Sequence, residues 1–100
     1  MIRILHTRRD ERCTLEICGH AESADFGRDV VCAGVSAITT TLALLLRDEN
    51  ADVQVKSGNT RITYTAGKDI EAYITFSMTG YRWMAEVFPE FVTLQEKTEC

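Results

Sequence analysis

Two residues in the first third of the chain, His20 and Cys32, could work together as a base and a nucleophile. Asp29 comes shortly before the cysteine and is a good residue to begin a helix, because its short carboxylate accepts hydrogen bonds from the free N–H groups of a first turn. Cys32 would then lie in that turn, where the positive end of the helix dipole favours a thiolate. A thiolate beside an imidazole is predisposed to attack a carbonyl carbon.

The same cysteine has two other interpretations. Cysteine is among the most often buried residue types, so Cys32 could be an inert core residue of an apolar helix. A zinc site could instead use Cys13, Cys18, Cys32 and His20 as its ligands. Their spacing lacks the Cys-x-x-Cys pair of most structural zinc sites, and the odd separation of Cys13 and Cys18 on one strand would send them to opposite faces. We therefore expect no metal and no cofactor.

The elements that must position this pair can be predicted along the whole chain. Alternating apolar residues between turn-forming residues predict strands over 1–7, 13–18, 53–56, 61–65 and 91–95, with turns at 8–12 and 57–60. Helical spacing predicts helices over 30 to about 47 and 68 to about 88, the second stopped by Pro89. The order ββαββαβ predicts one α+β domain over residues 1–100, with a mixed or antiparallel sheet packed against two helices. His20 would lie just beyond the end of the second strand, where its side chain can turn toward the first helix.

The first helix carries an apolar face and, beside it, the candidate nucleophile. Cys32 and Ser36 lie one turn apart on this helix. The Ser36 hydroxyl could bond the thiolate, His20, a substrate or the carbonyls of its own helix. The residues expected to form the buried stripe are Val31, Val35, Ile38, Leu42 and Leu45.

The second predicted helix is rich in aromatic residues. Phe76, Trp83 and Phe88 are expected in the core or in a subunit interface rather than around a ligand. Gly80 within this helix could permit either close packing or a bend, and the sequence does not decide between them.

Composition limits the classes of function. The chain has 100 residues, of which 45% are apolar and 26% charged, a balance typical of a soluble globular domain. No apolar run reaches the roughly 20 residues of a membrane span, and no signal-peptide layout is visible, so we expect a cytoplasmic protein with four reduced cysteines and no membrane contact. The net charge of −4 argues against direct binding of nucleic acid and suits a basic peptide.

The residues around the candidate pair also form a recognisable pattern. Gly19-His20-Ala21 is followed by Gly27, by Asp29-Val30-Val31-Cys32-Ala33 and by Val35-Ser36, and later come Gly80-Tyr81-Arg82-Trp83-Met84-Ala85-Glu86, Phe88-Pro89 and Val92-Thr93-Leu94. Over nearly its whole length the chain resembles the ribosomal-processing cysteine protease family, usually called Prp. It departs from the family pattern at Gly34, where a small residue, often alanine, is expected, and at Glu22, where many members carry glycine.

The resemblance implies a homodimeric cysteine endopeptidase that removes the N-terminal extension of large-subunit ribosomal protein twenty-seven. It implies His20 as general base and Cys32 as nucleophile, with Gly19, Asp29 and Ser36 in supporting roles. Backbone N–H groups near Gly19 or at the start of the helix would stabilise the oxyanion. The loop over 22–28 would form a flap or a wall of the substrate groove in such a protease, and from its residues alone it could equally be an ordinary connection from strand to helix. The alternative is a non-catalytic, ribosome-associated dimeric module that binds the same basic segment without cutting it.

Overall fold

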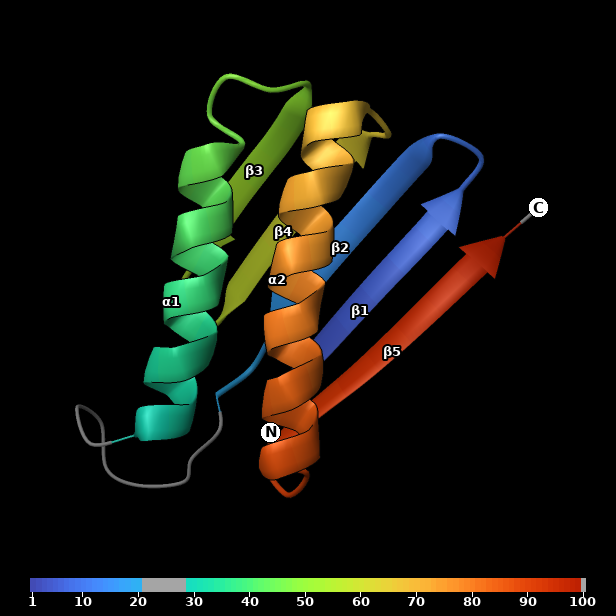
Figure 1. The fold of residues 1–100 in the computed structure, drawn as a ribbon. Helices are drawn as coiled ribbons and strands as arrows, with labels where there is room; N and C mark the ends of the chain where they lie inside the picture. The colour runs from blue at the N-terminus through green and yellow to red at the C-terminus, as the bar shows by residue number, and fades with distance from the viewer. Residues whose placement is uncertain (21–28, 100) are drawn as a thin grey trace.

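The computed structural model describes residues 1–20 and 29–99. Within these residues the elements follow the predicted order ββαββαβ: β1 (Ile2–Arg9), β2 (Arg12–Cys18), α1 (Val30–Leu45), β3 (Ala51–Lys56), β4 (Asn59–Thr65), α2 (Lys68–Val87) and β5 (Val92–Glu99). The strands form one mixed sheet in the order β3-β4-β2-β1-β5. Both of these helices lie on the same face of the sheet, α1 on the β3 side and α2 beside it (Figure 1). The predicted α+β fold is confirmed. No helix among the described residues is long and apolar enough to cross a membrane.

The first hairpin is tighter than the sequence predicted. β1 and β2 pair in antiparallel fashion as far as Arg9 and Arg12, so only Asp10 and Glu11 remain in the turn. Asp10 takes a φ of 54°, in the left-handed region that aspartate tolerates better than most residues. The charged side chains over 8–12 suggested a longer turn, but they are compatible with paired strands because they lie at the exposed end of the hairpin.

The alternation predicted along β2 is confirmed. Cys13, Leu15 and Ile17 are buried beneath the helices. Cys18 comes five positions after Cys13, an odd interval, and therefore belongs to the opposite face of the sheet. Its thiol lies 3.7 Å from the Asn59 side-chain oxygen on β4. These two cysteines consequently do not converge on one point.

The last strand is longer than predicted. The apolar pattern indicated an edge strand over 91–95, whereas β5 runs from Val92 to Glu99 and pairs in parallel with β1 along its whole length. Its second half is polar and exposed, so hydropathy alone could not reveal it. Its backbone pairs with β1 from Ile2↔Val92 to Arg9↔Glu99, so the strand continues past the last residue that packs in the core.

The buried stripe of α1 differs from the prediction at its centre and its end. Leu45 is 41% exposed, and Leu46, the C-cap residue, is 1% exposed because it continues the four-residue spacing from Leu42. Thr39 is buried where Ile38 was expected, and Ile38 is only partly buried. The Thr39 hydroxyl donates to the Val35 carbonyl at 2.8 Å and lies 2.6 Å from the Tyr81 hydroxyl of α2. Burial raises the pKa of Tyr81 to about 12, so its hydroxyl stays neutral in this contact.

Two glycines allow α1 and α2 to pack closely. A Cβ at Gly80 would lie 2.9 Å from Cδ1 of Ile38, and a Cβ at Gly34 would lie 3.0 Å from Cε of Met84. Gly80 therefore supports close packing, which answers the question that the sequence left open. The glycine at position 34, a departure from the family pattern, makes room for the Met84 side chain.

The aromatic residues expected in the core or in a subunit interface lie mostly outside the core. Phe76 is 74% exposed and Trp83 is 57% exposed, so neither belongs to the core. Phe88 is partly buried and meets Trp83 edge to face, with 6.3 Å between the ring centroids. The outer face of α2 thus carries apolar surface that this chain does not cover with its described residues.

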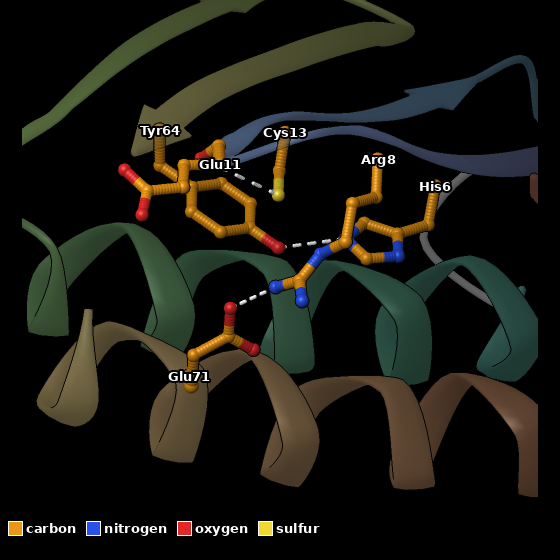
Figure 2. Close-up of polar contacts among 6 residues, drawn as sticks. All are labelled: His6, Arg8, Glu11, Cys13, Tyr64 and Glu71. Carbon is orange, nitrogen blue, oxygen red and sulfur yellow. Dashed lines mark hydrogen bonds and ion pairs between the residues drawn. The ribbon is translucent and has the colours of Figure 1, made fainter. Parts of the chain in front are cut away.

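A polar cluster lies between the sheet and α2, beside the start of β2 (Figure 2). Nε2 of His6 lies 2.6 Å from the Tyr64 hydroxyl, and Arg8 forms an ion pair with Glu71 of α2. The Cys13 thiol points to the Glu11 carbonyl at 3.9 Å. Burial raises the pKa of Tyr64. Burial also lowers the pKa of His6, and this outweighs the opposing effect of the Glu96 carboxylate.

The buried stripe predicts different costs for two leucines of α1. Leu42→Ala removes a side chain that is 0% exposed and should lower the free energy of unfolding by about 2–5 kcal/mol. Leu44→Ala, at a position that is 56% exposed, should change it by about 0.5 kcal/mol or less. Urea unfolding of both variants measures the difference, and equal losses would contradict the packing described here.

The His6–Tyr64 contact predicts a pH-dependent contribution to stability. Because the folded-state pKa of His6 lies below its ordinary value of about 6.5, the unfolded chain takes up the proton first as the pH falls. This contribution is present above pH about 6.5 and is lost as the pH falls toward the folded-state pKa. The stability advantage of the natural protein over His6→Gln should therefore shrink between pH about 7.5 and about 5.5, as measured by urea unfolding. A constant difference would rule out this effect.

Candidate active site

A cavity of about 810 Å³ lies between the first turns of α1 and the hairpin formed by β3 and β4. The site residues predicted from the sequence all line it: Gly19, His20, Asp29, Cys32 and Ser36. The structure thus brings the predicted set together around one space. The sequence analysis missed the opposite wall, to which the hairpin contributes Val55, Lys56, Gly58, Asn59 and Thr60.

Cys32 lies in the first turn of α1, as the N-cap prediction requires. Asp29 has an extended backbone, with φ −79° and ψ 94°, and its Oδ1 accepts a hydrogen bond of 2.9 Å from the Cys32 N–H. The Asp29 carbonyl accepts the next bond, from the Ala33 N–H at 3.0 Å. Asp29 therefore caps the helix, and the half-buried Cys32 side chain lies in its first turn.

His20 is positioned by two glycines. Gly19 ends β2 with a φ of 94°, and a Cβ there would collide with the Met1 carbonyl, so only glycine fits this turn. The Gly19 N–H donates to the Gly58 carbonyl at 2.8 Å, and the His20 carbonyl accepts a bond of 2.5 Å from the Met1 amine. These two hydrogen bonds fix the backbone directly before and directly after the Cα atom of His20.

The imidazole of His20 rests against the tip of the β3–β4 hairpin. A Cβ at Gly58 would lie 2.8 Å from Nε2 of His20, closer than real Cβ atoms come to a neighbour. Gly58 also has a φ of 70°, in the region that favours glycine. The turn at 57–60 was predicted, but no local signal in the sequence links it to His20.

Ser36 lies on the α1 wall of the cavity, one turn after Cys32. Thr39 and Thr41 donate to carbonyls four residues earlier in α1. No such bond is found for Ser36 among the hydrogen bonds between described residues. Of the roles that the sequence left open, those facing the cavity remain: the thiolate, His20 or a substrate.

The remaining predictions about the site concern metals and the loop. In the part of the chain that the structure describes, no group of three or more His, Cys, Asp or Glu side chains is placed to hold a metal ion. Cys13 is buried under the helices near the other end of β2 and does not line the cavity. The loop over 22–28, which we expect to act as a flap or wall, lies outside the described residues.

The contact between Gly58 and His20 predicts a selective effect of adding one methyl group. Gly58→Ala should destabilise the protein by about 1 kcal/mol or more, because a Cβ is disfavoured at this φ, and should displace the His20 ring. Gly67→Ala is the matched control, since a Cβ there meets only the Thr65 carbonyl oxygen, at 4.0 Å. NMR chemical shifts of the His20 ring report the displacement, and an unchanged signal in Gly58→Ala would contradict it.

Comparison with known proteins bears on this arrangement. A family model described as cysteine protease Prp matches residues 1–93. The fold is similar to that of the essential ribosomal processing protease Prp of Staphylococcus aureus with a covalently linked product peptide, with a TM-score of 0.86 and 22% identity over 97% of this chain and 100% of that one. The same protease with a substrate peptide gives a TM-score of 0.80 and 21% identity over 97% and 100% of the two chains.

A Streptococcus mutans protein of known structure is 27% identical, with a TM-score of 0.81, over 99% of this chain and 96% of that one. Comparison with curated proteins finds no match. The family model covers every described element up to the first residues of β5, including the whole cavity wall formed by α1 and the hairpin. The chain belongs to the cysteine protease Prp family.

Proposed function

We propose that this protein is a cysteine endopeptidase that removes the N-terminal extension of large-subunit ribosomal protein twenty-seven, with Cys32 as nucleophile and His20 as general base. The observation that carries the proposal is the presence of both side chains in one cavity, in a chain of the cysteine protease Prp family. The similar Staphylococcus aureus enzyme, a ribosomal processing protease, has been solved with a substrate peptide and with a covalently linked product peptide, which supports the assignment.

The proposed reaction proceeds through an acyl-enzyme. The Cys32 thiolate attacks the carbonyl carbon of the scissile peptide bond, and the protonated His20 gives its proton to the leaving amine as the C–N bond breaks. A water molecule then loses a proton to His20 and attacks the thioester. The new carboxylic acid leaves, and the thiolate and protonated imidazole are restored.

The oxyanion formed in each step needs donors of hydrogen bonds. The Gly19 N–H already donates to the Gly58 carbonyl and the Cys32 N–H to Asp29, so both of these amides are occupied in the present structure. The proposal therefore assigns the oxyanion to the other amides at the start of α1. In this proposal Gly19 and Asp29 support the reaction by holding His20 and Cys32 in place. Ser36 supports it through its hydroxyl on the α1 wall of the cavity.

The proposed substrate and setting follow from the same features. A net charge of −4 suits a basic ribosomal segment, and the reducing cytoplasm would keep Cys32 a thiol. We further propose a homodimer. The exposed Phe76, Trp83 and Val87 on the outer face of α2 support this, because contiguous apolar surface of this kind is typical of interfaces.

The decisive test is cleavage of the precursor with its extension, followed by mass spectrometry. Cys32→Ala and His20→Ala should each lower the rate of cleavage by about 10³-fold or more while leaving the fold intact. Cys18→Ala, which changes a cysteine outside the cavity, should retain cleavage. Cleavage by Cys32→Ala at the natural rate would disprove the proposed nucleophile.

A thiol-labelling experiment separates the protease from the binding module. A catalytic Cys32 should react with an alkylating reagent at low pH much faster than Cys13, Cys18 or Cys100. Binding of the precursor without any cut, together with uniformly slow labelling, would favour the non-catalytic module.

A further inference from the structure

The free edge of β3 carries backbone groups that its neighbour does not use. Thr65 N–H donates to the Asn50 carbonyl at 3.4 Å, which makes this pair a hydrogen-bonded one. In an antiparallel ladder such pairs alternate with pairs that do not exchange bonds. Gln54 therefore directs its backbone groups to β4, whereas Val53 and Val55 direct theirs to the open edge of the sheet.

This edge opens on the cavity that holds Cys32 and His20. Val55 lines the cavity, opposite the α1 residues Ser36, Thr40 and Ala43. Val55 pairs with the buried Thr60 and so points to the face that the helices cover, yet it is 68% exposed. The helix α1 lies on the β3 side of the sheet, and β3 is the outermost strand there (Figure 1).

The space along α1 has the length of a short extended peptide. Cys32 and Ala43 both line it, and a helix rises about 1.5 Å per residue, so the two ends are about 16 Å apart. An extended chain rises about 3.3 Å per residue, so about five residues of substrate would span this length. A strand in this place could use the backbone groups of Val53 and Val55 and cover the Val55 side chain.

The end of this space that lies farthest from Cys32, at the C-terminus of α1, carries negative charge. α1 ends at Leu45 with no basic residue in its last turn, so the negative end of its dipole is not neutralised there. The connection to β3 adds Asp48 and Glu49, and Asp52 follows on β3 itself, against the single cation Arg47 in the range 46–52. Basic side chains would be favoured at this end.

We propose that the substrate binds as an extended basic peptide added to the free edge of β3, running from Cys32 toward the acidic connection between α1 and β3. Strand addition of this kind obtains affinity from main-chain bonds and specificity from alternate side chains. The inference rests on the proposed protease function and describes how the same site holds its substrate.

Amide hydrogen exchange tests the main-chain contacts without cleavage. The probe is a ten-residue synthetic peptide that spans the junction and carries lysines at one end, added to the Cys32→Ala protein. The Val53 and Val55 amides should exchange about 3- to 10-fold more slowly when the peptide is bound. The Gln54 and Lys56 amides, already bonded to β4, should change little. Binding that leaves Val53 and Val55 unprotected would overturn the proposal.

A second experiment tests the peptide and the charges in the active protein. N-methylation of successive peptide amides should lower kcat/KM at every second position, because alternate amides of an added strand face β3. Asp48→Asn with Asp52→Asn should raise KM several-fold for the basic peptide and leave KM unchanged for a peptide with neutral residues at that end. Glu90→Gln, an exposed acid outside this region, is the control.

The two proposals fail in different ways. If the natural protein cleaves the peptide, but N-methylation lowers kcat/KM equally at every position, strand addition is wrong and the protease remains. The same holds if KM for the basic peptide does not change when Asp48 and Asp52 are replaced. Protection of Val53 and Val55 in a protein that never cleaves would overturn the protease and leave the docking edge intact.

Discussion

The central position of β2 determines where the candidate pair can meet. β2 is hydrogen-bonded to β1 on one side and to β4 on the other, so its end cannot shift along one neighbour without breaking the other ladder. The ladder continues past the strand through the Gly19 N–H and the Gly58 carbonyl. His20 therefore leaves the sheet at a defined point. The capped start of α1 brings Cys32 to the same cavity, so two independently determined ends form the site.

Local patterns were sufficient for the two ends that position the candidate pair. The alternation along β2 and the N-cap at Asp29 depend on neighbouring residues, and both were predicted correctly. The contact of Gly58 with His20 depends on sheet order, which no local pattern encodes. The sequence could not choose between core and subunit interface for Trp83 for a related reason, because an apolar residue on an exposed helix face has the same hydropathy as one in the core. The last buried residue of the α1 stripe was predicted one position too early, since spacing alone does not show whether Leu45 or Leu46 is buried.

The two ends of the sheet have different tasks. At the end where β2 begins, His6, Tyr64 and the Arg8–Glu71 ion pair fill the space between sheet and α2 with polar contacts (Figure 2). Partly buried polar groups of this kind are tolerated because they are paired, and burial accounts for the lowered pKa of His6 and the raised pKa of Tyr64. At the other end the cavity is open, and His20, Cys32 and Ser36 line a space of about 810 Å³.

The close packing of α1 on α2 determines which wall of the cavity can yield. Met84 fills the notch at Gly34 and Ile38 fills the one at Gly80, so α1 can neither slide along α2 nor tilt away from it without losing these contacts. In the opposite wall, β3 is an edge strand held by β4 on one side only, while the turn that follows it is also bonded to Gly19 through the Gly58 carbonyl. The cavity thus has one stiff wall and one compliant wall. Molecules of different girth would be accommodated by displacement of β3 at its free edge, whereas the His20 ring would keep its place, because the turn on which it rests is bonded to Gly19.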